Sequence, residues 1–243
     1  MKKGILAGIL SAALVAGSAV TAFAGTVSDI DCTGWWVAHS EAAEIADGAT
    51  VTYNFKSTTY ADATANWDGP IYVLYSADAA FAGGAGIKET AGYSEIFVCR
   101  GDLYGWTPSA NTNDGLGDGY SFVRDTEPDW DAFLTTEKAG AEGTVTASRD
   151  GSTVTVVMDF AGAKSTFTYT AASGTVYLSL GGELCTLTDM SYTSTSAADT
   201  TADDTTATDS TSGDALPFAV AALGLSALAA GAVVATKKFS FER

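Results

Sequence analysis

The sequence predicts an all-β protein, a two-sheet antiparallel sandwich of jelly-roll type, over residues 26–192. Apolar and polar residues alternate with a period of two through most of this region, which is the pattern of strands with one buried face. Glycine-containing turn signals separate about ten short apolar runs, and no repeat of solenoid length is present. The composition is rich in glycine and aromatic residues and low in charged residues, at 17%. A closed barrel is the alternative architecture.

The strands can be placed along the chain in order. Val51, Tyr53 and Phe55 alternate with polar residues, which predicts a strand with one solvent-facing side. The runs at 71–75 and 96–99 are apolar throughout, as central strands are. Further strands are expected at 144–148, 154–160, 167–169, 176–180 and 184–187, joined into a meander by turns at Asp150-Gly151, Ser173-Gly174 and Gly181-Gly182. No long helix is predicted, although residues 41–46 and 131–137 can each hold a short helical turn.

The beginning of the chain has the pattern of a secretory signal peptide. Met1-Lys2-Lys3 precedes an apolar run from Ile5 to Val20, and Ala22-Phe23-Ala24 supplies the small residues of a cleavage site. We therefore expect residues 1–24 to be a signal peptide that is cleaved after Ala24. A retained membrane anchor is the alternative.

The other end predicts a stalk and an anchor. Residues 193–214 consist of Thr, Ser, Ala and Asp with a single glycine, a composition that cannot bury a core and predicts a disordered linker. Residues 215–243 contain the uncharged apolar run Leu216–Thr236, which has the length of a transmembrane helix. Lys237 and Lys238 follow it and predict a cytoplasmic end, which places the sandwich on the extracellular face of the membrane.

The order of these segments resembles the surface-anchor tails of Gram-positive bacteria. Their sortase signal is L-P-x-T-G, and this chain has Leu216-Pro217-Phe218-Ala219-Val220, which matches at the first two positions only. The resemblance therefore implies a retained membrane anchor, with sortase processing as the alternative.

Charge and rare residues exclude several classes of function. The net charge of −17 argues against nucleic acid and anionic lipid as partners, because both require lysine and arginine. One histidine and three cysteines without a C-x-x-C pair argue against a zinc site. Cys32 lies in the first predicted strand and Cys185 in the last; first and last strands often pair in sandwiches, so a Cys32–Cys185 disulfide is one interpretation and free thiols are the other. Cys99 lies within an apolar strand and is expected to be a buried thiol.

The segment from Cys99 to Trp106 carries the most informative pattern of side chains. If it is extended, Arg100, Asp102, Tyr104 and Trp106 share one face, and small or apolar residues share the other. An aromatic ring can cover the apolar face of a pyranose, and the Arg and Asp groups can bind its hydroxyls. This face is therefore a candidate sugar site, and an internal ion pair with core aromatics is the alternative.

Other aromatic residues extend the candidate set. Trp35 and His39 are expected on one face of their segment and Trp36 on the other. Trp67 and Trp130 lie between carboxylate or amide residues and are candidate platforms on loops. In the turn-rich acidic loop 111–119, the oxygen atoms of Asn113, Asp114 and Asp118 are candidate ligands for Ca²⁺, although the spacing is not that of an EF-hand. A solvated loop is the other interpretation.

Several of these motifs also resemble a known group of domains. Gly34-Trp35-Trp36 with His39-Ser40, Asn66-Trp67-Asp68, Arg100-Gly101-Asp102 with Tyr104-Gly105-Trp106, and Trp130-Asp131-Ala132-Phe133 resemble the carbohydrate-binding β-sandwich modules of secreted polysaccharide-degrading systems in gut bacteria. The resemblance implies a non-catalytic cell-surface protein that captures a polysaccharide or oligosaccharide. No G-x-S-x-G, P-loop or H-E-x-x-H motif is present. A sandwich-fold glycoside hydrolase and a structural or adhesive protein with a protein partner are the alternatives.

Overall fold

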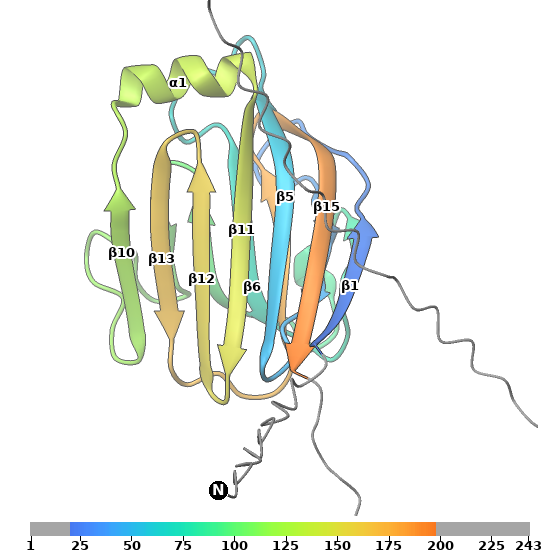
Figure 1. Cartoon of the computed structure of the whole chain (residues 1–243). Helices are drawn as coiled ribbons and strands as arrows, with labels where there is room; N and C mark the ends of the chain where they lie inside the picture. Colours follow the sequence, from blue (N-terminus) through green and yellow to red (C-terminus); the bar gives the residue numbers. More distant parts are fainter. Residues whose placement is uncertain (1–19, 198–243) are drawn as a thin grey trace, which may run out of the picture. The chain divides into compact units, whose positions relative to one another are not determined.

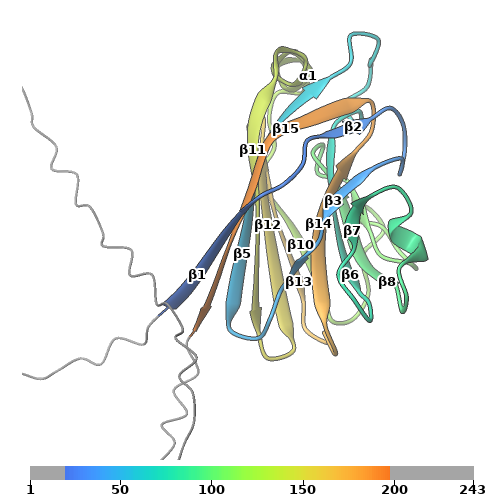
Figure 2. The same cartoon turned by 90° about the vertical axis from the view of Figure 1, so that its right-hand side faces the viewer.

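Two antiparallel sheets packed face to face form the part of the chain that the computed structural model describes, residues 20–197 (Figures 1 and 2). This arrangement confirms the predicted all-β sandwich. Within these residues no helix is both long and apolar enough to cross a membrane. The predicted anchor at 215–243 lies outside the described residues, as do most of the predicted signal peptide and most of the predicted linker.

The first sheet, called sheet A, has eight strands. Along its main path the order is β1-β15-β5-β11-β12-β13-β10, and β2 pairs with one end of β15. The strands are β1 (Val20–Thr26), β2 (Ile30–Cys32), β5 (Ala49–Thr59), β10 (Tyr120–Thr126), β11 (Ala141–Asp150), β12 (Thr153–Phe160), β13 (Ala163–Tyr169) and β15 (Cys185–Ala197).

The second sheet, called sheet B, has seven shorter strands in the order β7-β3-β14-β6-β8-β9, with β4 paired to β14. They are β3 (His39–Glu41), β4 (Ala43–Glu44), β6 (Pro70–Ser76), β7 (Ala82–Gly84), β8 (Ser94–Arg100), β9 (Gly105–Trp106) and β14 (Val176–Gly182). The one-turn 3-10 helix η1 (Ile87–Glu89) follows β7, and Figure 2 shows this segment on the outer side of sheet B.

The core lies between the sheets and explains the alternation in the sequence. Tyr53 of β5 and Phe160 of β12 point inward from sheet A and meet Tyr72 and Leu74 of β6. The other side chains of β6, including Val73, belong to a second apolar cluster on the outer side of sheet B. Because both faces of β6 are covered, its sequence is apolar throughout, as the run at 71–75 predicted.

The predicted meander holds for three strands and then changes sheet. Strands β11, β12 and β13 pair in succession, with the expected turn at Asp150-Gly151. Strand β14, however, lies in sheet B between β3 and β6, and β15 returns to sheet A. Every residue of β14 is buried, so this strand needs cover on both faces. Only sheet B offers such cover, since polar side chains line the outer face of sheet A.

Two predicted segments overlap with paired strands of sheet A. Strand β15 continues to Ala197, so the start of the predicted linker at 193–197 is paired strand rather than linker. Its Thr and Ser residues pair with residues 49–52 of β5, and the β-branched threonines suit a half-exposed strand. On its other side β15 pairs with β1, which includes residues 20–24 of the predicted signal peptide.

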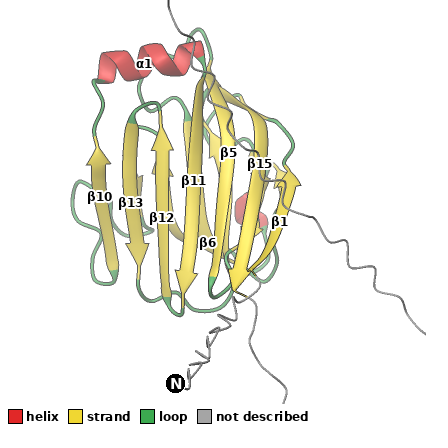
Figure 3. Ribbon diagram, viewed as in Figure 1, coloured by secondary structure: helices red, strands yellow, loops and turns green. Residues whose placement is uncertain are grey.

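One full helix replaces the short turn predicted at 131–137. Helix α1 (Trp130–Ala139) lies across one end of the sandwich (Figure 3). The Asp129 carboxylate caps it by accepting hydrogen bonds from the backbone N–H groups of Asp131 (3.1 Å) and Ala132 (2.9 Å). Phe133 and Glu137 are its buried residues, one helical repeat apart.

Removing this cap should weaken the fold by a small amount. Asp129→Ala is expected to lower the free energy of unfolding by about 1 kcal/mol, because two backbone donors lose their acceptor. Asp129→Asn keeps a capping oxygen and should stay within about 0.5 kcal/mol of the wild type. Urea unfolding of both variants checks this. An equal loss in the two variants would assign the effect to the charge and not to the cap.

Candidate functional site

Residues 100–104 form a tight turn between β8 and β9, and not the extended segment that the sequence suggested. The backbone N–H of Arg100 donates to the carbonyl of Tyr104 (2.9 Å), and Leu103 adopts a left-handed conformation with φ of 63°. The two strands stay in antiparallel register, with Val98 opposite Trp106. Because β8 and β9 keep this register on either side of the turn, the side chains of Arg100, Tyr104 and Trp106 lie on the same side of the hairpin, as predicted.

Arg100 and Asp102 form a two-pronged ion pair at this turn. Arg100 donates from Nε to Asp102 Oδ1 (3.0 Å) and from Nη2 to Asp102 Oδ2 (2.7 Å). The Asp102 side chain is only 6% exposed, and its Oδ1 also accepts from the backbone N–H of Tyr104. Asp102 therefore orients Arg100 and has little capacity left for a ligand. The guanidinium lies 4.7 Å from the centre of the Tyr104 ring and keeps its remaining N–H groups as donors.

Four aromatic side chains meet beside this ion pair. We call Trp35, Trp36, Tyr104 and Trp106 the aromatic platform. Ring centres are 5.5 Å apart for Trp35 and Trp106, 6.1 Å for Tyr104 and Trp106, and 5.7 Å for Trp35 and Trp36. Trp35 is 41% exposed and the other three are partly buried, so the group offers apolar ring surface to solvent over a packed base.

Trp36 belongs to this group although the sequence placed it on the opposite face. The loop between β2 and β3 is not a strand, and Trp36 has a left-handed φ of 60°, which breaks the alternation of sides. The Trp36 ring lies 4.9 Å from the His39 ring and 4.0 Å from the Lys88 ammonium, the latter a cation–π contact. A strand pattern with a period of two does not predict that Trp36 or Lys88 lies at this site.

His39 packs against the platform and has little exposed surface. Its side chain is 3% exposed and packs between Trp36 and the backbone of Gly181. Burial, followed by the nearby positive charge of Lys88, lowers the pKa of His39 to about 4. The imidazole is therefore neutral at pH 7, and the contact of His39 with sugar stays a prediction.

Acidic groups surround the inner side of the Arg100 turn. Asp68 is buried and accepts from the backbone N–H groups of Thr64 and Ala65. Burial, then the charge of Asp68, raises the pKa of Glu183, and Arg100 opposes that shift. Glu183 is partly exposed and provides a carboxylate near Arg100 that the sequence did not single out. The buried Glu137 completes this group from helix α1.

The remaining predicted tryptophans occupy different settings. Trp67 is 50% exposed in the loop between β5 and β6 and makes no ring contact with another aromatic side chain of the described residues. Its loop adjoins the Arg100 turn, because Gly101 N–H donates to the carbonyl of Pro70 (2.9 Å). Trp130 is the first residue of helix α1 and packs edge-on against the core residue Phe133. It is a structural residue rather than a loop platform.

Side-chain oxygens in the acidic loop 111–119 accept hydrogen bonds from neighbouring residues. Asn113 Oδ1 accepts from Arg124 (2.7 Å), and Asp114 Oδ2 accepts from the amide of Asn111. Asp118 is exposed. Within residues 20–197 no group of three or more His, Cys, Asp or Glu side chains is arranged to hold a metal ion. Ca²⁺ binding by Asn113, Asp114 and Asp118 stays a prediction.

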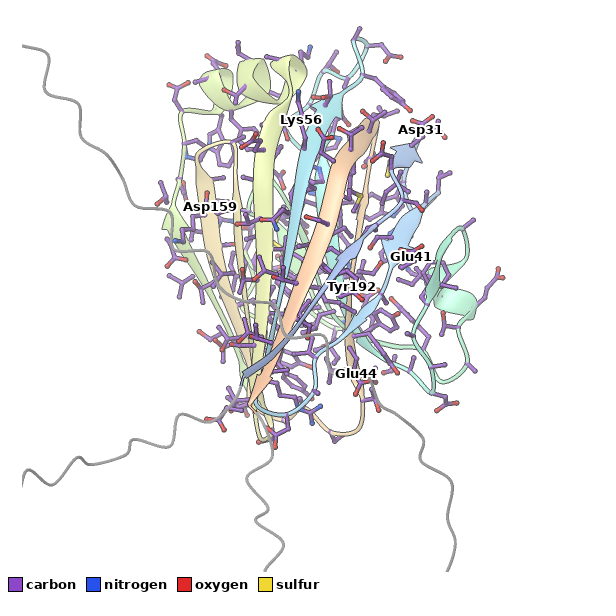
Figure 4. All side chains as sticks on the ribbon, turned by 45° about the vertical axis from the view of Figure 1, so that its right-hand side comes forward. Asp31, Glu41, Glu44, Lys56, Asp159 and Tyr192 are labelled. Atoms are coloured by element: carbon purple, nitrogen blue, oxygen red, sulfur yellow. The ribbon has the colours of Figure 1, made fainter. Side chains whose placement is uncertain are left out.

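A groove lies on the outer face of sheet A. This shallow groove of about 390 Å³ is lined by polar side chains that include Lys56, Glu142 and Asp159, with a buried phenylalanine beneath. Figure 4 shows Lys56 and Asp159 on this face. None of the residues that line the groove offers an exposed aromatic ring, in contrast to the platform on sheet B.

Comparison with known proteins assigns no family. No protein-family model and no curated protein matches the chain. Similar solved structures include lectin I-B4 from Griffonia simplicifolia in a metal-free form, at 14% identity and a TM-score of 0.33 over 75% of this chain and 94% of the lectin. Peanut lectin with a nine-residue peptide has 14% identity and a TM-score of 0.35 over 77% and 95% of the two chains. Lectin UEA-II complexed with galactose has 10% identity and a TM-score of 0.33 over 73% and 92%.

Proposed function

We propose that this protein binds a polysaccharide or oligosaccharide at the aromatic platform, and that it is a non-catalytic protein of the extracellular cell surface. The contact between exposed Trp35 and Trp106, next to the oriented Arg100 guanidinium, carries this proposal. The two tryptophan rings, tilted by 37° to each other, supply apolar surface that a pyranose ring can cover, and Arg100 supplies hydrogen-bond donors for its hydroxyls.

The charged groups around the platform suit a hydroxylated ligand. Arg100 is paired with Asp102 and lies near Glu183, and Lys88 lies 3.9 Å from Glu95. Positive and negative charges therefore lie side by side, and the site offers donors and acceptors without a strong net charge. Sugar hydroxyls act as both donors and acceptors, so they match such a surface better than a purely anionic ligand does.

The carboxylates favour a binding function over hydrolysis. A glycoside hydrolase needs two accessible carboxyl groups about 5–10 Å apart. Asp102 is committed to Arg100, and Glu95 contacts Lys88 and accepts from the hydroxyl of Tyr93. Glu183 is partly exposed and has a raised pKa, but its neighbour Asp68 is buried and held by backbone N–H groups. Glu137 also has a raised pKa and is buried.

The cell-surface setting in this proposal comes from the sequence alone. The predicted signal peptide at 1–24, linker at 193–214 and anchor at 215–243 would hold the platform outside the membrane, within reach of glycan in the medium. This part has its own test. Removing residues 215–243 should release the protein from the membrane into the medium.

Retention on a panel of insoluble polysaccharides tests the binding function. The full-length chain in mild detergent is expected to be retained by at least one glycan and to release no reducing ends from it. Release of reducing ends would assign the chain to the glycoside hydrolases. A folded chain retained by none of the glycans, but captured by protein ligands, would support the adhesive alternative.

A further inference from the structure

Two cysteines lie opposite each other where β2 pairs with β15. Cys32 ends β2, Cys185 begins β15, and the register makes them direct partners, as the sequence suggested for first and last strands. Direct partners in antiparallel strands have Cα atoms about 4.5–5.5 Å apart. Disulfides span Cα separations of about 4.4–6.8 Å. The backbone therefore already has the spacing that a bridge needs.

Their sulfur atoms also face each other. Both side chains are fully buried, and both cysteines are free thiols in the structure. A Cβ atom at Gly182 would clash with Cys185 Sγ and would lie 3.3 Å from Cys32 Sγ, so both sulfurs lie over the same glycine. Cys99 lies elsewhere, in β8, where its strand partners are Tyr72 and Gly105.

We propose that Cys32 and Cys185 form a disulfide bond that fixes the loop carrying Trp35 and Trp36, while Cys99 stays a thiol. In this reaction each of the two thiols loses its hydrogen and one S–S bond forms. The two electrons and two protons pass to an oxidant of the disulfide class. The S–S bond of that oxidant breaks to give two thiols.

The position of the pair links it to the aromatic platform. The loop 33–38 starts directly after Cys32 and leads from sheet A to sheet B. Cys32 Sγ also lies 3.8 Å from the carbonyl of Ala38, at the far end of the same loop. The bridge would thus hold the base of the loop from which Trp35 reaches Trp106. Without it, the three-residue β2 is held by its backbone pairing with β15, by packing and by the hydrogen bond that the Tyr60 hydroxyl donates to Asp31.

Burial determines when the bridge can form. The hydrogen bond with Cys32, followed by burial, raises the pKa of Cys185 well above its usual range. Thiolate is the reactive form in disulfide exchange, so the Cys185 thiol reacts slowly once the fold has closed, and both sulfur atoms are buried away from a reductant. The bridge is therefore expected to form during folding and to resist reductants afterwards.

Peptide mapping tests the pairing. The full-length chain is refolded either with oxidised glutathione or with a reductant, and free thiols are then alkylated in denaturant. With oxidised glutathione we expect a Cys32–Cys185 cross-linked peptide and alkylation of Cys99 alone. Three alkylated cysteines, or a bridge that contains Cys99, would overturn the proposal.

Comparison of the oxidised and reduced wild type tests the effect on the loop without any substitution. The oxidised form is expected to melt on the order of 5–10 °C higher, because the bridge closes a long loop of the unfolded chain. Its near-ultraviolet circular dichroism should show a stronger tryptophan signal. The difference should vanish in Cys185→Ala and persist in Cys99→Ala. Identical melting temperatures and spectra for the two wild-type forms would refute a bridge that fixes the loop.

A glycan measurement completes the test and rests on the proposed function. Reduced wild-type protein should be retained several-fold more weakly than oxidised protein, because Trp35 is held less firmly. Equal retention of the two forms would count against the link between bridge and platform. If even the oxidised protein is retained by no glycan, the proposed function fails, whereas the mapped Cys32–Cys185 peptide would still establish the bridge.

Discussion

Glu137→Gln is expected to stabilise the protein at neutral and alkaline pH by several kcal/mol. Glu137 is 1% exposed, and neither of its carboxyl oxygens has a hydrogen-bond partner among residues 20–197. A Cβ atom at Gly69 would lie 2.5 Å from Glu137 Oε1, so the carboxyl group lies directly against the backbone there. Burial, followed by the charges of Asp102 and Asp68, raises the pKa of Glu137 to about 9.

The direction of the pH effect follows from proton linkage. The folded state holds its proton on Glu137 up to about pH 9, whereas the unfolded state loses it near the ordinary glutamate pKa of 4.5. Between these values the folded state binds more protons, so the free energy of unfolding falls as pH rises. Each pH unit in this window costs up to about 1.4 kcal/mol. The stability gained from the proton that folded Glu137 holds is fully present below the pKa of the unfolded state. It is lost as pH rises through the pKa of the folded state.

Urea unfolding between pH 4 and pH 9 measures this effect. The difference between Glu137→Gln and the wild type should be small at pH 4 and should grow steadily towards pH 9. Glu142→Gln removes one exposed charge from the next strand and should show no such growth. Parallel curves for wild type and Glu137→Gln would mean that Glu137 is ionised in the fold. The position of its buried carboxyl group would then need a cationic partner.

The strands could be predicted from the sequence because the alternation of apolar and polar residues is a local pattern. The burial of Glu137 could not be predicted, because it depends on contacts between distant segments. Val51, Tyr53 and Phe55 alternate with polar residues because one side of β5 faces the core, and this cause is visible within a few residues. The burial of Glu137 depends instead on where helix α1 meets the loop at Gly69. Nothing within the helix sequence marks its single glutamate as protonated.

The candidate site was predictable where the backbone stays regular. Arg100, Tyr104 and Trp106 share a side because the β8–β9 hairpin keeps its register through the turn. Trp36 was placed on the wrong side because its left-handed conformation belongs to a loop. Asp102 was predicted to touch sugar, but the tight turn brings it onto Arg100 instead. Contacts between distant segments, such as Trp35 with Trp106, required the fold itself.

Trp35→Ala is expected to weaken glycan retention about tenfold while leaving the fold intact. The ring is exposed, so its removal costs little core packing, but the ligand loses a stacking surface worth about 0.5–1.5 kcal/mol beyond area burial. Trp106→Ala should weaken retention similarly and also lower stability, because Trp106 packs against the second apolar cluster. Val123→Ala removes an exposed apolar side chain from sheet A and should change neither property.

A double variant that carries both Trp35→Ala and Trp106→Ala shows whether the two tryptophan rings act as one binding surface. Their centres are 5.5 Å apart, so each ring supports the other. The combined loss in binding free energy should therefore be smaller than the sum of the single losses, since contacting residues are not additive.

Trp67→Ala measures how far the site extends: a loss would join the β5–β6 loop to the platform, and unchanged retention would end the site at Arg100. If folded Trp35→Ala protein is retained as well as the wild type on every glycan, the platform is not the binding surface, and the groove beside Lys56 and Asp159 becomes the surface to test.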